Sequence, residues 1–188
     1  MTPAGPSTLG RMRRTLLLAA LAVLLGACGV LPESSDAAQI VVVAPEEREP
    51  APAIVAETLS GGMMALSDVR ADGPVVVNFW ASWCGPCRQE APHLNAVVAA
   101  YAEDGVRVVG VNGRDELVPA RSFAAGNFQF ESWYDPDQAI AAQFGAHGPV
   151  GMPSTLILDR DGRVAVRFFG AVSGATLGPR LEALLAEA

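Results

Sequence analysis

From residue 75 onward, short runs of apolar residues alternate with stretches in which apolar residues recur every three or four positions. The runs Val75–Trp80 and Val106–Val111 are typical of strands buried on both faces. Between them, the apolar residues of 91–101 fall on one face of a helix that ends before Gly105. A strand, a helix and a second strand in this order predict a parallel pair of strands covered by a helix.

The rest of the chain continues this alternation. Asp159-Arg160-Asp161-Gly162 is a turn signature that predicts an antiparallel hairpin between the strands on either side of it. We therefore expect an α/β layered domain, Ala53–Ala188, with parallel strands first and a hairpin behind them. The remaining expected elements are helices at Leu117–Ala125, Gln138–Phe144 and Leu177–Ala186, and strands at Thr155–Leu158 and Arg163–Phe169.

The first 27 residues have the pattern of a secretory signal. Arg11, Arg13 and Arg14 precede a ten-residue apolar run, Leu16–Leu25, and small residues follow it. A membrane-spanning helix needs about 20 apolar residues, so this run is too short to be one. We therefore assign residues 1–27 to a cleaved signal peptide.

The end of this signal resembles a lipoprotein processing site. Leu25-Gly26-Ala27-Cys28 is similar to the lipobox of bacterial lipoproteins, whose cysteine is diacylated and becomes the new N-terminus. The resemblance implies a lipid on Cys28 and attachment to the extracytoplasmic face of the cell membrane. Ordinary cleavage nearby, with Cys28 lost or left free, is the alternative.

A linker is expected between Cys28 and the domain. Residues 28–52 are rich in Pro, Glu and Ser, and as a flexible coil they would reach about 27 Å. The cluster Ile40–Val43 does not fit a solvated linker. The sequence leaves open whether this cluster belongs to the tether or adds a strand to the domain.

Charge and cysteine content narrow the function. The 188 residues carry 13 basic residues, all Arg, against 20 acidic ones, a net charge of −7 that becomes −10 without residues 1–27. This balance excludes a nucleic-acid binder, which would carry a basic face. The three cysteines are too few for a four-cysteine zinc site. What remains is one acidic domain that a lipid would hold at the membrane.

Cys84 and Cys87 stand where the strand Val75–Trp80 is followed by the first amphipathic helix. A thiol at a helix N-terminus is stabilised as thiolate by unpaired N–H groups and by the helix dipole. We expect Cys84 to face solvent as the nucleophile and Cys87 to be more buried and able to close a disulfide with it. A static disulfide is one alternative, and a zinc site with His93 as a third ligand is another.

The residues around the cysteine pair form a recognisable set of motifs: Leu66–Arg70, Asn78–Arg88, Glu90-Ala91-Pro92, Gly151–Thr155 and the turn Asp159–Arg163. Together these motifs resemble the active-site region of thioredoxin-fold proteins, and more specifically that of the membrane-anchored TlpA/ResA subfamily. The resemblance implies a thioredoxin-like fold over residues 53–188, with a central mixed β-sheet flanked by helices.

The subfamily also implies a mechanism without a metal or cofactor. The Cys84 thiolate attacks a substrate disulfide, and Cys87 then attacks Cys84 and releases the reduced substrate. Pro153 matches the family's cis-proline, so the backbone of Met152 is expected to pair with an extended substrate. The remaining residues expected to contact substrate are Trp83, Gly85 and Pro86.

Two further side chains are candidates for tuning the cysteines. Glu90 matches an acidic residue that TlpA/ResA proteins keep near the active site, so general acid/base catalysis or tuning of the thiol pKa values is expected of it. Asn78 stands where thioredoxin-like relatives often place a buried Asp, and Asn does not shuttle a proton. The alternative for Glu90 is a solvated glutamate paired with an Arg. His147, in an unusually long loop, is a candidate for stabilising the Cys84 thiolate, and the alternative is a solvated loop histidine.

The leading hypothesis is a lipid-anchored, monomeric thiol–disulfide oxidoreductase that reduces protein disulfides. By resemblance, its client is apocytochrome c, and a membrane thiol donor of the CcdA/DsbD type supplies its electrons. An oxidase that forms disulfides in secreted proteins is the alternative, because the motif alone does not set the redox potential. The alternative that is not an enzyme is a copper chaperone similar to the Sco proteins, which use Cys-x-x-x-Cys and a distant His, whereas two residues separate Cys84 from Cys87 here. A peroxiredoxin is not expected, because its Thr-x-x-Cys site is absent from the sequence.

Overall fold

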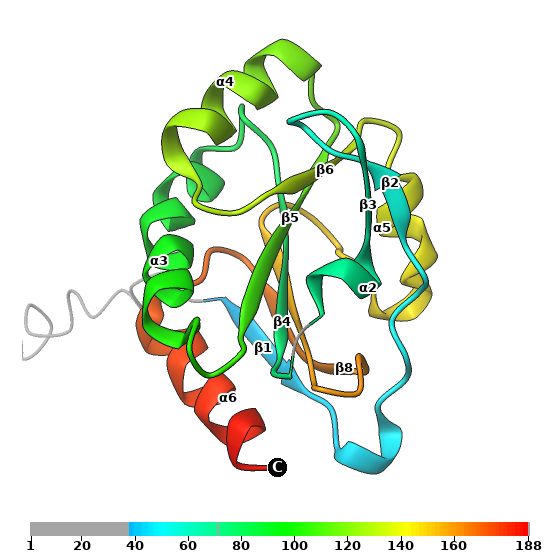
Figure 1. The fold of residues 1–188 in the computed structure, drawn as a ribbon, viewed down its shortest axis with the longest axis vertical. Helices are drawn as coiled ribbons and strands as arrows, with labels where there is room; N and C mark the ends of the chain where they lie inside the picture. The colour runs from blue at the N-terminus through cyan, green and yellow to red at the C-terminus, as the bar shows by residue number, and fades with distance from the viewer. Residues whose placement is uncertain (1–37, 71, 188) are drawn as a thin grey trace, which may run out of the picture. The chain divides into compact units, whose positions relative to one another are not determined.

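A six-stranded mixed sheet forms the centre of the computed structural model, which describes residues 38–70 and 72–187 (Figure 1). Its strand order is β1-β8-β7-β4-β5-β6. Strands β4, β5 and β6 are parallel, whereas β7 is antiparallel to β4 and to β8, and β1 is antiparallel to β8. The strands are β1 (Gln39–Val42), β4 (Val75–Trp80), β5 (Arg107–Gly113), β6 (Ser132–Asp135), β7 (Ser154–Leu158) and β8 (Val164–Phe169).

Helices cover both faces of this sheet, which confirms the predicted thioredoxin-like α/β architecture. Helices α3 (Gly85–Tyr101) and α6 (Gly174–Ala186) lie together on one face (Figure 1). On the other face lie the shorter helices α2 (Leu66–Val69) and α5 (Ala139–Gln143). Helix α4 (Leu117–Asn127) follows β5. Short 3₁₀ helices lie at η1 (Pro45–Glu47) and η2 (Gly145–His147).

Strand β4 shows why the apolar runs lie at the centre of the sheet. All six of its residues are buried, and successive side chains point to opposite faces. Val76 packs in the core beneath α3 and α6, whereas Val77 and Phe79 pack in the core on the α5 side. Because β4 is an inner strand of the sheet, its carboxyl end lies in the middle of one sheet edge. Binding sites of α/β proteins occur at such strand ends.

The predicted hairpin is confirmed by β7 and β8. The turn Asp159–Gly162 joins them, and the Asp159 carboxylate accepts hydrogen bonds from the N–H groups of Asp161 and Arg163. Gly162 adopts a positive φ of 78°, which glycine adopts without strain.

The segment before the predicted domain boundary is also folded. Gln39–Val42 pairs with β8 along the sheet edge, and Pro50 forms a further bridge with Arg163. A flexible tether over residues 28–52 is therefore wrong from residue 38 onward, because the Ile40–Val43 cluster supplies an edge strand. The predicted signal peptide, Cys28 and the first part of the predicted tether lie outside the described residues, so they stay predictions.

Three strands that the hydrophobic pattern did not indicate are present. β2 (Val55–Glu57) and β3 (Met63–Ala65) form a separate two-stranded sheet, and β6 carries mixed polar and aromatic residues. The strands β2 and β3 are only three residues long and partly exposed, so they lack an apolar run. Within the described residues, no helix is both long and apolar enough to span a bilayer.

Candidate active site: a disulfide at the start of helix α3

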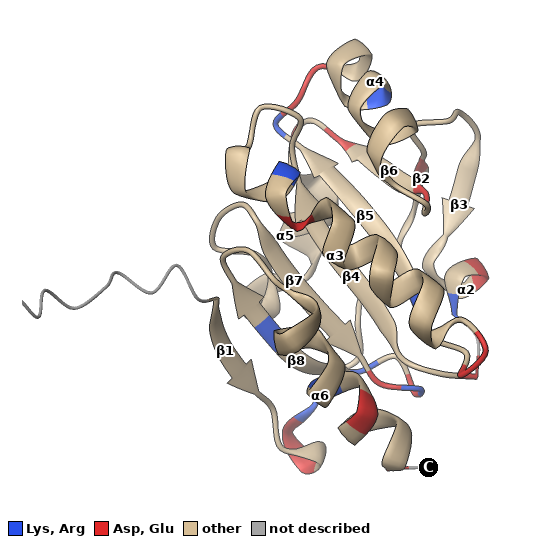
Figure 2. Ribbon diagram, turned by 90° about the vertical axis from the view of Figure 1, so that its left-hand side faces the viewer, with Lys and Arg blue, Asp and Glu red and all other residues tan. Residues whose placement is uncertain are grey.

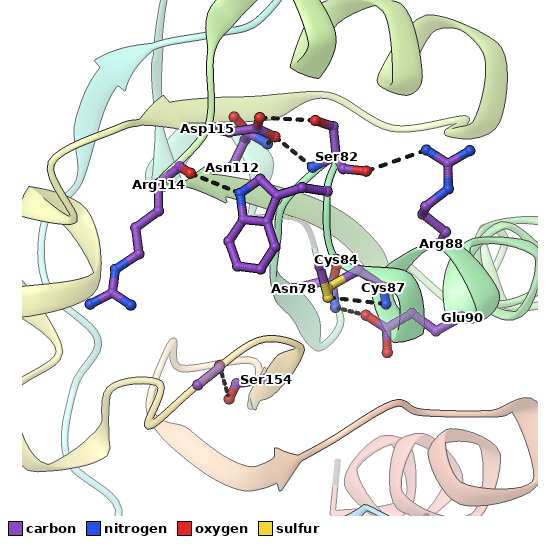
Figure 3. The surroundings of a disulfide bond; sticks show 12 residues. Asn78, Ser82, Cys84, Cys87, Arg88, Glu90, Asn112, Arg114, Asp115 and Ser154 are labelled. Atoms are coloured by element: carbon purple, nitrogen blue, oxygen red, sulfur yellow. Dashed lines mark hydrogen bonds between the residues drawn. A yellow bond between two sulfur atoms is a disulfide. The ribbon is translucent and has the colours of Figure 1, made fainter.

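Cys84 and Cys87 form a disulfide at the start of α3 (Figure 3). Strand β4 ends at Trp80, a short loop follows, and Cys84 is the N-cap residue of the helix. Its sulfur accepts a hydrogen bond from the Cys87 N–H at 3.3 Å. The predicted placement of the cysteine pair between a buried strand and a helix N-terminus is therefore confirmed.

The disulfide is less accessible than the sequence suggested. Cys84 is only 4% exposed and Cys87 is fully buried, so the expectation that Cys84 faces solvent is wrong although it is the more exposed of the two. The reason is packing, because both sulfurs belong to an apolar cluster that includes Ala91 and Phe123. The predicted substrate-contacting residues Trp83, Gly85 and Pro86 are exposed around this buried disulfide.

The Met152–Pro153 peptide bond is cis, as the resemblance implied. Within the described residues, neither the N–H nor the carbonyl of Met152 has a hydrogen-bond partner. Both Met152 and Trp83 line a cavity of about 250 Å³, with Phe79 and Val111 also in its lining. The structure thus brings Trp83 and Met152 to one cavity, whereas Gly85 and Pro86 are not part of its lining.

Glu90 lies in a buried polar network one helical turn beyond Cys87. Its side chain is fully buried, and Asn78 donates to Oε1 at 2.8 Å while the Val172 N–H donates to Oε2 at 2.8 Å. The same Asn78 amide donates to the Thr155 hydroxyl at 3.0 Å. Among residues 38–70 and 72–187, no Arg forms an ion pair with Glu90, and its side chain is fully buried, so the alternative of a solvated, Arg-paired glutamate is wrong.

Burial without a cation changes the acidity of Glu90. Removal from water disfavours the charged carboxylate and raises the pKa of Glu90 to about 7, although its two hydrogen bonds work in the opposite direction. Residues three positions apart are neighbours on a helix surface, so Glu90 and Cys87 share the buried face of α3. A carboxyl group that gains and loses a proton near neutral pH is therefore placed beside the inner cysteine (Figure 3).

His147 does not take part in the site. Its Nε2 lies 3.2 Å from the Glu49 carboxylate, in the segment that precedes β2, and it bonds neither cysteine. The hypothesis that His147 stabilises the Cys84 thiolate is therefore wrong. Among residues 38–70 and 72–187, no group of three His, Cys, Asp or Glu side chains could hold a metal ion.

Asp115, which belongs to no motif recognised in the sequence, holds the loop before Cys84 through its carboxylate. It lies in the turn between β5 and α4 and accepts hydrogen bonds from both the N–H and the hydroxyl of Ser82 (Figure 3). The signal that was available is topological, because β4 and β5 are parallel neighbours and polar residues that follow their carboxyl ends meet at one edge.

A reversible two-electron exchange needs two sulfurs that can bond to each other and a surface on which a second disulfide can approach. The Cys84–Cys87 pair supplies the first, and the exposed residues around it with the unpaired Met152 backbone supply the second. Proteins with this site on this fold are thiol–disulfide oxidoreductases.

Comparison with known proteins identifies the family. Residues 48–167 match the AhpC/TSA family, and the chain belongs to it. It is 31% identical over 121 residues to the thiol-disulfide oxidoreductase ResA of Bacillus thuringiensis (strain Al Hakam), covering 64% of this chain and 68% of ResA. It is 34% identical over 123 residues to the thiol:disulfide interchange protein HelX of Rhodobacter capsulatus, and the match covers 64% of this chain and 65% of HelX.

A solved structure agrees with this assignment. A DsbF homologue from Corynebacterium diphtheriae has 32% identity and a TM-score of 0.71, covering 81% of this chain and 95% of that one. The chain is therefore a TlpA/ResA-like thiol–disulfide oxidoreductase, an enzyme with a Cys-x-x-Cys centre.

Proposed function

We propose that the chain is a lipid-anchored reductase of protein disulfides at the extracytoplasmic face of the cell membrane. The observation that supports the direction of electron flow is the buried Glu90 beside Cys87, whose partners in the described part of the chain are the neutral Asn78 amide and the Val172 N–H. A negative charge there disfavours a nearby thiolate, whereas strong oxidants owe their high potential to a stabilised reduced form. The disulfide form is favoured, so the dithiol gives up its electrons readily.

The reaction proceeds by two exchanges. The Cys84 thiolate attacks one sulfur of the client disulfide, so a mixed disulfide forms and the second client sulfur leaves as thiolate. The Cys87 thiolate then attacks the Cys84 sulfur, which closes the Cys84–Cys87 disulfide and releases the client dithiol. The client gains two electrons, and a membrane thiol donor of the CcdA/DsbD type returns two electrons to the enzyme.

Glu90 handles the proton of the second step. Cys87 is fully buried, so its thiol must lose a proton to a group inside the protein before it attacks Cys84. Ionised Glu90 accepts that proton, and a pKa of about 7 allows it to return the proton in the next cycle. Asn78 and the Val172 N–H hold the carboxyl group in place for this transfer.

The client binds as an extended segment across the cis-proline loop. The free N–H and carbonyl of Met152 pair with the client backbone in the manner of an added strand. The 250 Å³ cavity that Trp83 and Met152 line takes a client side chain, and its lining offers both apolar contacts and the polar side chains of Arg114, Asp135 and Gln138. Gly85 and Pro86 form the exposed surface over which the client disulfide approaches Cys84.

The client class follows from the TlpA/ResA resemblance, which implies the Cys-x-x-Cys-His site of apocytochrome c. The protein works as a monomer, and a lipid on Cys28 holds it at the membrane. For the anchor, Cys28→Ala should move the full-length protein from the detergent phase into the aqueous phase. Partitioning of the wild type into water would refute lipidation.

A trapping experiment tests the reductase assignment. In Cys87→Ser, the mixed disulfide on Cys84 cannot be resolved, so clients should accumulate on the protein and be identifiable by mass spectrometry. Cys84→Ser is the matched control and should capture none of them. In cells that lack the protein, the trapped clients should accumulate as disulfides, whereas their accumulation as dithiols would make the protein an oxidase.

A further inference from the structure

The carboxylate of Asp115 gathers donors from three segments. It accepts from the Ser82 N–H and, at 2.9 Å, from the Ser82 hydroxyl, both in the loop before Cys84. It also accepts at 2.9 Å from the Asn112 amide, near the end of β5, and at 2.9 Å from the N–H of Glu116, the N-cap residue of α4. Asp115 thus joins the active-site loop to the turn between β5 and α4.

The next residue of the active-site loop is bound to the same turn. The Trp83 indole Nε1 donates to the Arg114 carbonyl at 2.8 Å. Within the described residues, the side chains of Ser82 and Trp83 make no other hydrogen bond. The orientation of both side chains therefore depends on a turn that lies more than 30 residues away in the chain.

This loop also fixes the reacting sulfur and one wall of the client cavity. The Cys84 N–H donates to the Ala81 carbonyl at 3.1 Å, so residues 81–84 form a tight turn that presents Cys84 as the N-cap of α3. Trp83, 60% exposed, lines the cavity together with Met152. A shift of Ser82 and Trp83 would move both the Cys84 sulfur and the cavity wall.

We propose that Asp115 is a positioning residue for disulfide exchange: by holding Ser82 on the β5–α4 turn, its carboxylate keeps Cys84 in reach of Cys87 and keeps Trp83 at the client cavity. The proposal rests on exchange at the cysteine pair and holds for either direction of electron flow. Holding two reacting groups together raises their effective concentration, so the clamp favours the disulfide over the dithiol.

Four variants separate the effect of the hydrogen bonds between Asp115 and Ser82, here called the clamp, from the effect of the negative charge of Asp115. Asp115→Ala removes all the acceptors. Asp115→Asn removes the charge and keeps an oxygen for the Ser82 N–H and the Asn112 amide and an NH₂ for the Ser82 hydroxyl, and it loses only the bond from the Glu116 N–H. Ser82→Ala removes one bond and leaves the charge. Glu116→Gln is the control, because this neighbouring acid is exposed and its side chain makes no described hydrogen bond.

The measurement is the equilibrium of the full-length protein with glutathione, in which two glutathione molecules reduce the enzyme disulfide and leave as one oxidised dimer. Asp115→Ala should shift this equilibrium about tenfold toward the dithiol, equivalent to about 30 mV for a two-electron couple. Ser82→Ala should shift it about threefold in the same direction. Asp115→Asn should shift it less than Asp115→Ala, and Glu116→Gln should match the wild type.

Fluorescence quenching gives a second readout. Trp80 and Trp133 are fully buried, so acrylamide reports chiefly on Trp83, and Asp115→Ala should make that indole more accessible. Equal shifts for Asp115→Asn and Asp115→Ala would show a charge effect and overturn the clamp. An unshifted equilibrium in a folded Asp115→Ala protein, checked by circular dichroism, would overturn it as well. The wild-type potential separately tests the reductase assignment, so the two ideas fail independently.

Discussion

Two buried carboxyl groups at opposite ends of the sheet differ in the charge of the groups that bind them. Glu90, at the disulfide end, accepts hydrogen bonds from neutral donors and pairs with no cation among the described residues, and burial raises its pKa to about 7. Asp159, in the β7–β8 turn, is paired with the buried Arg48 guanidinium at 3.2 Å. Arg48 also binds Glu187 at 2.6 Å, and charged residues gather at this end in Figure 2.

The two ends respond to pH with opposite signs. The Arg48 hydrogen bond lowers the pKa of Glu187, so that contribution to stability is present above the unfolded value of 4.5 and is lost as the pH falls further. Glu90 has a raised pKa, so the native state keeps a proton that the unfolded chain releases, and stability falls as the pH rises from 4.5 to about 7. At the disulfide end, the buried Glu90 carboxyl group is bound by neutral donors, which suits it to proton transfer. At the other end, the buried Asp159 carboxyl group is paired with Arg48, which stabilises the fold.

The largest expected effect is at the paired end. Arg48→Ala leaves the Asp159 carboxylate without its cation, and the loss of one partner of a buried pair should lower the free energy of unfolding by about 3 kcal/mol. Denaturant unfolding measures this, with Arg160→Ala as an exposed control in the same β7–β8 turn. The redox equilibrium of the cysteines should not change. Unaltered stability would mean that the ion pairs contribute nothing.

At the reactive end, Glu90→Gln should remove a pH dependence of stability. A pKa raised from 4.5 to about 7 corresponds to about 3 kcal/mol of unfolding free energy that the wild type loses between these pH values. The variant should show a flat profile in this window, measured by denaturant unfolding at several pH values. Exchange with a client disulfide should also slow at least tenfold, because Cys87 loses its proton acceptor. An unchanged profile would show that Glu90 ionises normally.

Asn78→Asp sharpens the comparison by adding a second carboxyl group to the unpaired end. Its oxygen would face Glu90 at the present 2.8 Å contact, and two such groups cannot both ionise. We expect a further loss of roughly 2 kcal/mol of unfolding free energy at pH 8. Thr155→Val is the control, because it removes a hydrogen bond from Asn78 without adding a charge. Equal losses in both variants would assign the effect to hydrogen bonding alone.

The smallest effect is expected at Gly85. A Cβ there would meet no atom within 4 Å and its φ is not in the left-handed region, so Gly85→Glu should fold normally. The added charge at the exposed rim should raise the pKa of the Cys84 thiol and favour the disulfide by a factor of two to three, about 0.5 kcal/mol. Thiol titration measures this, with Gly85→Gln as the neutral match. A lower pKa in the Glu variant would contradict it.

The features that depend on residues close together in the chain could be predicted from the sequence. The run Val75–Trp80 and the Cys84–Cys87 spacing specify their own strand and helix start, so the sheet centre and the disulfide followed from the pattern. The cis bond before Pro153 and the proposed role of Glu90 needed the family resemblance, because nothing in the local sequence distinguishes these residues from an ordinary proline and glutamate.

The signals that failed depend on contacts between distant segments. Asp115 is an ordinary loop acid until parallel pairing of β4 and β5 brings it to Ser82. His147 was misplaced because its partner, Glu49, lies in a segment expected to be linker. The edge strand Gln39–Val42 was ambiguous because its four residues gain their partners only from β8.

The reduction potential of the Cys84–Cys87 pair in the full-length protein tests the central claim most directly. The measurement is equilibration with a thiol redox buffer, followed by acid quenching and thiol labelling. The full chain is needed because a fragment beginning at residue 53 would lose β1 and Arg48. Because only neutral donors hold the Glu90 carboxylate in the described residues, we expect a reduction potential near or below about −250 mV, close to that of thioredoxin. A value above about −180 mV, toward the strong oxidants, would contradict the reductase assignment.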